Sequence, residues 1–564
     1  MKKSAIIVIA LLSFLLTIRA QQSTKHEVRA VWLTTIGGID WPHSYNGQRQ
    51  KDELRRTLDQ LQSAGINTVL FQARVRATTV FPSTMEPWDA CLTGKPDHAP
   101  SYDPLRLVID ECHQRGMELH AWVVTIPIGK WDSFGARQLR KTQPSLVKKI
   151  GEEAFMNPAH PQTADYLARF CRDIVERYDV DGIHLDYIRY PETWPKARNN
   201  AERNKRSEEI TRIVSRISTT VKAVKPWVKM SCSPIGKYSD LLRYRSGGWN
   251  ARNAVSQDAQ LWMRMGLMDE LFPMMYFRDN QFFPFAIDWQ EQAAGRIVVP
   301  GLGIYFLDPR EGKWGLTDVT RQMNVARQLG MGHCYFRSKF LTDNIKGIYT
   351  FAQQFDATPA LIPPMTWARK TPPSAPAQLE HNGQVLSWTE AHNNNDSPYL
   401  LYNVYASRQY PVDIHDAQNL VATRIRATAV SVPADKGIFY AVTACDRYGQ
   451  ESMPCQSAAP DADAIADFWQ VGDDEYLAYW QTDDILITDG KWLKLPYKPS
   501  TLDAQYIIVE TLQGQQLAFL PYKGRYAHIG NLPEGIYALR SLGRKGRNHR
   551  IGYFGIKHPR HSSR

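Results

Sequence analysis

The chain has 564 residues, a formal net charge of +11 and seven cysteines. The cysteines are scattered and odd in number, which argues against a disulfide framework and against a CxxC-type metal site. A bond between Cys445 and Cys455 stays open. The charge is modest for this length and is spread out apart from basic stretches near the C-terminus, so it favours polyanionic glycans or acidic surfaces only weakly.

The N-terminus has the pattern of an export signal. Two lysines precede an apolar run from Ala5 to Ile18, and a small residue follows at Ala20. We therefore predict a secretory signal peptide over residues 1–20. The run is shorter than the roughly 20 apolar residues of a bilayer span, and no later segment is long and apolar enough. The sequence predicts an exported protein that is periplasmic, cell-envelope associated or secreted, with no membrane span.

Short strand-like runs alternate with helical periodicity between residues 27 and 356. The eight strand candidates begin near Val28, Asn67, Met117, Asp181, Val228, Asp269, Arg296 and Gly332. Eight uninterrupted β/α alternations predict an α/β fold, a (β/α)8 TIM-type barrel. The alternative is an open doubly wound sheet, but no Gly-rich phosphate loop follows the first strand.

The composition and periodicity of the sequence change after the predicted barrel. Residues 357–377 are rich in proline and are interpreted as a linker. Short alternating strands over 378–460 predict a β-sandwich that resembles a fibronectin type III domain, with Trp388 as its core tryptophan. Residues 461–564 contain further short strands and predict a small β-rich domain.

The fourth strand candidate, DGIHLDYIRYP, runs from Asp181 to Pro191 and contains acids among apolar residues. Alternate residues share a face, so His184, Asp186 and Ile188 point to one side. Active sites of such barrels lie at the carboxyl ends of the strands, which puts Asp186 near the rim if that side faces inward. A carboxylate there is costly unless it is paired or used. We predict that Asp186 is catalytic; the alternative is a structural carboxylate satisfied by the backbone and an arginine.

Polar and aromatic side chains stand at the other predicted strand ends and in the loops. Sugars offer C–H faces to aromatic rings and hydroxyls to carboxylates, amides and guanidinium groups, so a cup of this composition suits a glycan. The predicted substrate-binding residues are Asp40, Trp41, Gln72, Arg74, Trp88, His120, Trp122, His184, Tyr190, Tyr276 and Tyr305. For any single tryptophan core packing explains the position equally well, and His120 alone is better explained as a hydrogen-bonded core histidine.

Several segments between residues 27 and 345 resemble segments of one protein family and occur in the same order. Among them are EVRAVWLTT, INTVLFQARVRATTVFPS, EPWDACLTG, SYDPLRLVIDECHQRGMELHAW and LFPMMYF. With these segments and the DGIHLDYIRYP strand, the chain resembles the glycosyl hydrolase-like 10 family of bacterial exported proteins. The resemblance implies a (β/α)8 barrel with glycosidase-like activity on bacterial cell-wall or other extracellular glycans. One departure is that VVTIPIGK follows HAW, where many members look more like an Asn-Pro-Tyr-Arg run.

A more distant resemblance concerns the mechanism. DGIHLDYIRYP looks like the DGxDxDxE-Tyr-Pro strand of chitinase-type glycosidases, and Met275-Tyr276 looks like their Met-x-Tyr strand. In those enzymes the final Glu is the acid, the preceding Asp orients the acetamido group of the substrate and the Tyr helps to hold it. Asp186 matches that Asp, but Ile188 stands at the acid position. Either Asp186 is itself the nucleophile or acid, with a partner from another strand, or hydrolysis has been lost.

Hydrolysis normally needs two carboxyls, unless the acetamido group of the substrate attacks. The partner candidates, in falling order, are Asp279, Asp308 and Asp40, because each follows a predicted inner strand. No HExxH-like cluster and no GxSxG motif is present, so we expect no metal, no cofactor and no serine nucleophile. The Asp186–Tyr276 pair favours peptidoglycan-type N-acetylated strands as the polysaccharide partner, and no nucleic-acid partner is expected. The alternative function is a catalytically silent glycan-binding or scaffold protein. The linkage, the retaining or inverting outcome and the oligomeric state stay open.

Overall fold

The computed structural model describes residues 24–242, 244, 248–434 and 437–457, and after these mainly the strands between 485 and 556. The predicted signal peptide, residues 1–20, lies outside the described residues. The chain forms two compact units. The first contains most of the chain up to Ser457, and the second contains residues 407–412, 435–439 and the chain from Ala458 onward.

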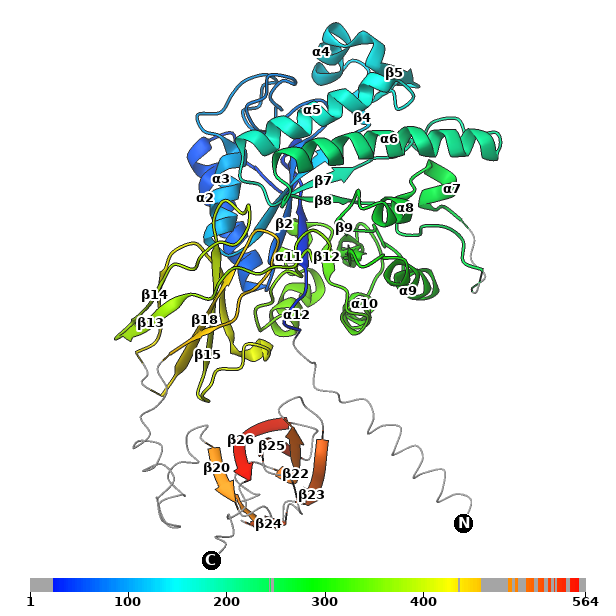
Figure 1. The fold of residues 1–564 in the computed structure, drawn as a ribbon. Coiled ribbons are helices and arrows are strands. Elements are labelled where there is room, and N and C mark those ends of the chain that lie inside the picture. The colour runs from blue at the N-terminus through cyan, green and yellow to red at the C-terminus, as the bar shows by residue number, and fades with distance from the viewer. Residues whose placement is uncertain are drawn as a thin grey trace, which may run out of the picture. The chain divides into compact units, whose positions relative to one another are not determined.

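A parallel sheet closes into a barrel at the centre of the first unit (Figure 1). Its strands follow one another in chain order: β1 (Arg29–Leu33), β2 (Thr68–Arg74), β3 (Glu118–Val124), β7 (Gly182–Asp186), β8 (Lys229–Cys232), β9 (Glu270–Leu271), β10 (Ile297–Val298), β11 (Gly301–Leu302) and β12 (His333–Tyr335). β10 pairs with β9, and β11 pairs with β12. Because β10 and β11 belong to one extended stretch, together they form one barrel strand, and the sheet closes on itself with eight strands. The predicted (β/α)8 barrel is confirmed.

Helices cover the outside of the barrel (Figure 1). Several begin where the sequence supplies a capping side chain: Asn46, Asp103 and Asn199 each accept a hydrogen bond from a backbone N–H in the first turn. Their apolar faces pack on the sheet and form a large hydrophobic core between helices and strands. The helices are α2 (Gly47–Ser63), α3 (Pro104–Gln114), α4 (Phe134–Thr142), α5 (Pro161–Arg177), α6 (Asn200–Val224), α7 (Ala251–Val255), α8 (Ala259–Arg264), α9 (Phe283–Glu291), α10 (Leu316–Gln328), α11 (Ser338–Thr342) and α12 (Ile348–Phe355).

An antiparallel insert follows the carboxyl end of β3. It consists of β4 (Pro127–Lys130), β5 (Val147–Ile150) and β6 (Glu153–Met156), in the order β4-β6-β5, together with α4. The insert therefore stands on the same end of the barrel as the loops that form active sites in this fold.

The barrel lumen contains a second, smaller hydrophobic core and a buried ion pair. Trp32, Trp122 and Phe272 are among the apolar side chains of this lumen cluster. At the amino-terminal end of the strands, Lys229 Nζ lies 2.5 and 2.7 Å from the two carboxylate oxygens of Glu118. The lumen is thus apolar in its middle and charged at its base, which is covered by the domain described next.

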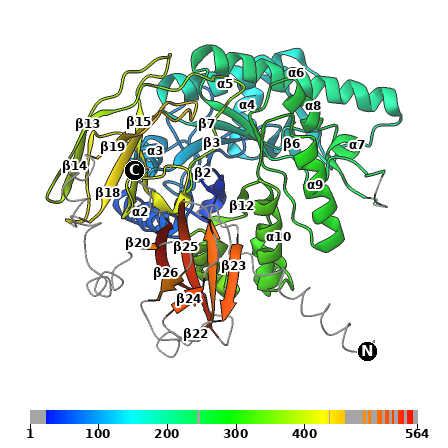
Figure 2. The same ribbon diagram turned by 60° about the horizontal axis from the view of Figure 1, so that its bottom comes forward.

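Residues 377–456 form two antiparallel sheets (Figure 2). Trp388 of the first sheet is buried, and its ring centre lies 5.3 Å from that of Tyr402 in the second. The first contains β13 (Ala377–Asn382), β14 (Val385–Thr389) and β17 (Ala429–Ser431); the second contains β16 (Leu420–Ile425), β15 (Leu401–Ser407), β18 (Phe439–Cys445) and β19 (Cys455–Gln456). We refer to them together as the β-sandwich. Its likeness to a fibronectin type III domain stays a prediction. Cys445 and Cys455 both have free thiols.

The proline-rich segment 357–377 lies partly against the barrel. Glu27 N donates to Leu361 O at 2.9 Å, and Trp367 Nε1 donates to Asp269 Oδ1 at 2.8 Å. Leu361 and Met365 are buried. The first half of the predicted linker is therefore packed chain rather than a free tether, and the domain limits of the sequence analysis stay predictions.

The second unit contains a five-stranded sheet and a separate strand pair. The sheet has the order β20 (Ile485–Thr488), β26 (Asn548–Ile556), β25 (Gly535–Gly543), β22 (Ala504–Thr511), β23 (Gln516–Pro521), and the pair is β21 (Trp492–Lys494) with β24 (Tyr526–His528). An additional β-rich part at the C-terminus was predicted. Within the described residues, no helix has the length and apolar content that crossing a membrane requires.

Candidate active site

Asp186 is the last residue of β7, and its carboxylate is held by donors from both neighbouring strands. Oδ2 accepts from Trp122 Nε1 on β3 at 3.1 Å, and Oδ1 accepts from Ser233 Oγ, just after β8, at 2.7 Å. The backbone N–H of Tyr187 also donates to Oδ1, at 2.8 Å. The carboxylate is therefore fixed at the carboxyl end of the barrel lumen.

The surroundings of Asp186 raise the pKa of its carboxyl group. Burial raises its pKa above the ordinary value, while Arg189 and the hydrogen bonds from Ser233, Tyr187 and Trp122 act in the opposite direction. The balance is a raised pKa. Carboxyls with a raised pKa serve as general acids near neutral pH, because they hold a proton that they can deliver to a leaving oxygen.

The alternation along β7 ends at Asp186. His184 faces the lumen, where its Nε2 accepts from Trp32 Nε1 at 3.2 Å and its Nδ1 lies 3.0 Å from Ser231 Oγ. Burial lowers the pKa of His184 well below its ordinary value, so the ring is neutral and part of the lumen packing. Ile188 does not share this face but packs in the helix-facing core, because Tyr187 adopts a left-handed φ of 50° and breaks the strand.

Aromatic side chains border the same end of the lumen. The ring centre of Tyr276 lies 5.7 Å from that of Tyr305 and 5.3 Å from that of Phe336. The Tyr276 hydroxyl is buried and has no hydrogen-bond partner among the residues that the structure describes. Burial raises its pKa well above the ordinary value, and Cys334 and Asp186 act in the same direction. The negative charge of Asp186 thus acts on this unpaired hydroxyl.

The three partner candidates differ in environment. Asp279 opens the short helix η3 (Asp279–Gln281), is exposed, and lies 3.4 Å from Arg321 Nη1. Asp308 follows the short helix η4 (Ile304–Leu307), and hydrogen bonds from Arg310 lower its pKa to about 2. In the described part of the chain, neither of these two carboxylates forms a hydrogen bond with Asp186.

Asp40, the third candidate, is buried after β1. Its Oδ2 accepts from Thr34 N at 3.0 Å, and Arg337 pairs with its other oxygen. Burial raises the pKa of Asp40, and Arg337 opposes that shift. The pKa of Asp40 is thus shifted in the same direction as that of Asp186, but within the described residues no hydrogen bond connects the two.

Three predicted binding residues at the ends of β1 and β2 are engaged within the fold. Trp41 is fully buried and donates from Nε1 to Gln50 O at 2.9 Å. Gln72 Oε1 accepts from the backbone of Thr35 and Ile36, at 2.9 Å each, and so shapes the loop after β1. Arg74 is buried in a two-pronged pair with Glu86, at 2.6 and 2.7 Å. We leave these three side chains out of the proposed site.

Three other predicted binding residues make their contacts away from Asp186. Tyr190 donates to Glu209 on α6, on the helix side of the sheet. Trp88 is half-buried against the helix-facing core. His120 lies at the base of the lumen, with Nε2 3.3 Å from Glu118 Oε2. Of the predicted binding residues, Trp122 donates a hydrogen bond to Asp186, and the charge of Asp186 raises the pKa of Tyr276.

Two residues beside Asp186 were not predicted from the sequence. Ser233 and Ser231 alternate along VKMSCSPIG, and small polar residues at alternate positions of a barrel strand are a signal for a polar inner face. Arg189 lies within DGIHLDYIRYP, a segment that carries the resemblance to the family. A charged residue directly after a strand end is the signal that could have identified it.

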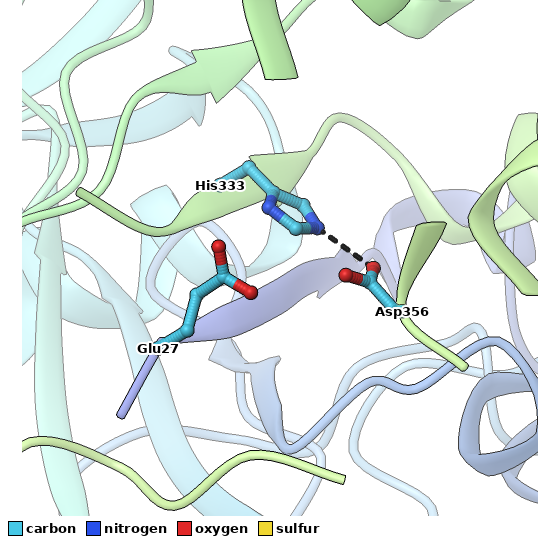
Figure 3. A group of neighbouring side chains, drawn as sticks. All are labelled: Glu27, His333 and Asp356. Atoms are coloured by element: carbon cyan, nitrogen blue, oxygen red, sulfur yellow. Dashed lines mark hydrogen bonds and ion pairs between the residues drawn. The ribbon is translucent and has the colours of Figure 1, made fainter. Parts of the chain in front are cut away.

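A second cluster of potential ligands lies at the base of the barrel, where Glu27, His333 and Asp356 approach one another (Figure 3). Two arginines occupy the carboxylates. Arg327 lies 2.5 Å from both Glu27 Oε2 and Asp356 Oδ1, and Arg29 Nε lies 2.7 Å from Glu27 Oε2. A cation would meet two guanidinium charges there, so the donor set does not suit a metal. The cluster instead joins the first and the last segments of the barrel chain.

Comparison with known proteins identifies the family. A family model described as Glycosyl hydrolase-like 10 matches residues 27–305. Glycosyl hydrolase DigH of Escherichia coli (strain K12) is 30% identical over 293 residues, which are 45% of this chain and 67% of the relative. The chain belongs to the glycosyl hydrolase-like 10 family.

Two further matches of this glycosyl hydrolase-like 10 protein are a second relative and a solved structure. Glycosyl hydrolase YngK of Bacillus subtilis (strain 168) is 27% identical over 484 residues, covering 77% of this chain and 93% of the relative. Among solved structures, the catalytic domain of β-amylase from Paenibacillus polymyxa is 10% identical, with a TM-score of 0.40 over 59% of this chain and 98% of that chain. That last likeness is too remote to bear on the substrate or the reaction.

Proposed function

We propose that this protein is an exported glycoside hydrolase that cleaves glycosidic bonds in peptidoglycan-type, N-acetylated cell-wall glycan strands. One observation carries the proposal: a carboxyl with a raised pKa, that of Asp186, is fixed by three donors at the carboxyl end of a barrel strand. The chain belongs to a glycosyl hydrolase-like family, and the two relatives described above are named glycosyl hydrolases. The apolar N-terminal pattern supports export.

Asp186 acts as the proton donor in this account. It delivers its proton to the glycosidic oxygen as the bond from that oxygen to the anomeric carbon breaks. The carboxylate left behind is stabilised by the N–H of Trp122 and the hydroxyl of Ser233, which already donate to it. A water molecule later returns a proton to Asp186 and a hydroxyl to the sugar, so the balance is one water consumed for each bond.

The attacking group is the acetamido oxygen of the sugar, which bonds to the anomeric carbon as the glycosidic bond breaks and is displaced from that carbon when water adds its hydroxyl there. Substrate-assisted hydrolysis needs no second carboxyl beside the acid, which agrees with the separate environments of Asp279 and Asp308. The Tyr276 hydroxyl, buried and unpaired in the described part of the chain, is suited to donate to the acetamido group and orient it. A plain hydroxyl sugar would leave such a buried donor unpaired, at a cost of about 1 to 3 kcal/mol.

A second candidate function is a catalytically silent glycan-binding protein. It is favoured by the packing of Ile188, which stands at the acid position of chitinase-type strands, in the helix-facing core. The two functions differ in one measurable respect. A hydrolase releases new reducing ends from a glycan that it binds, whereas a silent binder leaves the chain length of the glycan unchanged.

The test offers purified peptidoglycan glycan strands, chitin oligomers and neutral β-glucans and α-glucans in parallel, with released ends identified by mass. We expect cleavage of the N-acetylated strands and none of the glucans. Binding of N-acetylated strands without release of ends would favour the silent protein. Comparable cleavage of a neutral glucan would contradict the acetamido argument and leave the glycosidase in place.

A further inference from the structure

Tyr187, the residue that follows the proposed proton donor, has an unusual backbone conformation. Its φ is 50°, in the left-handed region that residues with a side chain rarely adopt. Of the residues other than glycine that have a positive φ in the described part of the chain, Tyr187 alone is aromatic. Such strained conformations persist only where the surrounding structure holds them, and they are concentrated at functional positions. Contacts around Tyr187 must therefore balance the strain.

The peptide unit between Asp186 and Tyr187 is fixed on both of its sides. The carbonyl oxygen of Asp186 accepts from Thr125 N at 2.9 Å and from Thr125 Oγ1 at 2.8 Å, directly after β3. The N–H of the same unit, that of Tyr187, donates to Asp186 Oδ1 at 2.8 Å. A peptide unit is planar and rigid, so a rotation that breaks the contact with Thr125 also breaks the contact with the carboxylate.

Directly after this peptide unit the chain leaves the direction of β7. The carbonyl oxygen of Tyr187 accepts from Arg189 N at 2.9 Å, which closes a tight turn. Ile188 packs in the helix-facing core, and its carbonyl oxygen accepts from Gln257 Nε2 at 3.3 Å. An extended residue at position 187 would continue the strand instead. The left-handed conformation therefore allows the turn without moving the peptide unit before it.

The side chain of Tyr187 contributes packing on the lumen side. Its ring packs against the lumen cluster, and the guanidinium carbon of Arg189 lies 4.1 Å from the ring centre. The hydroxyl of Tyr187 has no hydrogen-bond partner among the residues that the structure describes. The contact of Tyr187 that orients Asp186 is thus made by the backbone N–H and not by the hydroxyl.

We propose that Tyr187 is a positioning residue for the hydrolysis: its left-handed backbone lets the chain turn while the Asp186–Tyr187 peptide unit stays in place and aligns the carboxyl group of Asp186. This inference rests on the proposed function and deepens it. A displacement of about 1 Å in a catalytic group can cost about 100-fold in rate, so precise alignment of the proton donor compensates for a strained residue beside it.

The pH dependence of the reaction reports this alignment, because Asp186 is the group that titrates. Burial raises the pKa of Asp186, and the N–H of Tyr187 is among the contacts that act against burial. The other titratable or charged described residues that act on Asp186 or respond to it are Arg189, Tyr187, Cys232 and Tyr276. The pKa values of the last three are raised, so these groups keep their protons near neutral pH, and a guanidinium stays charged there.

The test changes the backbone preference at position 187 in the full mature chain. Tyr187→Gly and Tyr187→Asn accept a left-handed φ, whereas the β-branched side chain in Tyr187→Val resists it. All three variants lack the ring, so its loss is common to them, and Tyr187→Phe keeps the ring without the hydroxyl. Ala294→Val is the matched control, because Ala294 has a φ of 52° at an exposed position after α9.

We expect kcat/KM on N-acetylated cell-wall glycan strands to be about 10-fold or more lower in Tyr187→Val than in Tyr187→Gly and Tyr187→Asn. The alkaline limb of the profile should move to higher pH in Tyr187→Val, since the ionised carboxylate loses a donor, and should stay in place in the other two. Tyr187→Phe should keep the native limb and activity close to that of the native protein. Ala294→Val should lose thermal stability and keep the limb.

Equal losses in Tyr187→Val and Tyr187→Gly, an unmoved limb in Tyr187→Val, or a loss in Tyr187→Phe as large as in Tyr187→Val would overturn the positioning role. If Tyr187→Val does not fold, Tyr187→Ala takes its place in the comparison, because its smaller side chain strains the left-handed backbone less.

A measurement without turnover separates this inference from the proposed function. The pKa of Asp186 is followed by carbon NMR of chains labelled at the aspartate carboxyl carbons, with the resonance assigned by its absence in Asp186→Asn. A higher pKa in Tyr187→Val than in Tyr187→Gly and Tyr187→Asn supports the role of Tyr187 in holding Asp186, even if the native protein cleaves no glycan and the proposed function fails. Equal pKa values in the three variants of a protein that cleaves glycan would refute the positioning role and leave the hydrolase.

Discussion

Arg424 of the β-sandwich donates from Nη2 to Asp181 Oδ1 at 2.6 Å, across 243 residues of sequence. Arg447 Nη2 lies 3.1 Å from the same oxygen. Asp181 directly precedes β7, and Asp186 ends it. The strand that presents the proposed proton donor is thus held at its base by two arginines from the β-sandwich.

The first prediction concerns this buried ion network. Arg424→Met should lower the free energy of unfolding by about 3 to 5 kcal/mol, because Asp181 and Glu118 lose a charged partner in a buried position. The measurement is urea denaturation followed by circular dichroism. Arg426→Met is the matched control: its side chain is 56% exposed and its ion pair with Asp179 is 3.8 Å long, so we expect a change below about 1 kcal/mol. Equal losses in the two variants would contradict the network.

The same network predicts how stability depends on pH. Burial alone would raise the pKa of Glu118, but Lys229 and Arg424 outweigh it and lower the value to about 2. The pKa of Asp181 is also lowered well below its ordinary value, against its burial, by His113, Arg424 and Arg447. Depressed values mean that the ionised forms stabilise the fold, so this contribution is present above the ordinary pKa near 4 and is lost as pH falls toward 2.

We therefore expect the free energy of unfolding to fall steeply between about pH 5 and pH 2, with a smaller slope in Glu118→Gln than in the native protein. Denaturation midpoints in urea at several pH values check this. An identical slope in the variant would show that Glu118 does not titrate with unfolding. A rise in stability on acidification would reverse the predicted sign.

Truncation tests whether the β-sandwich is part of the barrel fold. A chain that ends at Pro359 lacks Arg424 and Arg447 and leaves the carboxylates at the barrel base without these partners. It also lacks Leu361, which accepts from Glu27 N. We expect this chain to unfold well below the native melting temperature or to aggregate. A chain that ends at Ser457 should keep the native melting temperature. A stable, cooperative transition in the shorter chain would support an independent barrel.

Local periodicity was sufficient to predict the barrel, its eight strands and the common face of His184 and Asp186. It failed at Ile188 because the strand ends at a left-handed Tyr187, which no apolar pattern reveals. It also could not separate Trp41 and Arg74, which serve the core, from Trp122, which donates to Asp186, since the residue types are the same. Pairs such as Arg424 with Asp181 join distant segments, so only the folded chain brings them together.

Ser233 provides a test of the electrostatics at Asp186. Its hydroxyl donates to the ionised carboxylate and so lowers the pKa of Asp186. In Ser233→Ala that pKa should rise further, because the ionised carboxylate loses a hydrogen bond that stabilises it. Since the protonated form is the active one, the alkaline limb of kcat/KM should move to higher pH. An unmoved or lowered limb would contradict Asp186 as the acid.

The most direct measurement is turnover of N-acetylated cell-wall glycan strands by Asp186→Asn. The account predicts a loss of activity of about 100-fold or more, because an amide cannot deliver a proton to the leaving oxygen, together with binding of the glycan and a cooperative unfolding transition like that of the native protein. Asp165→Asn, at an exposed position of α5 paired with Arg216, controls for the loss of a carboxylate elsewhere on the barrel. Full activity in a well-folded Asp186→Asn protein would contradict the central claim.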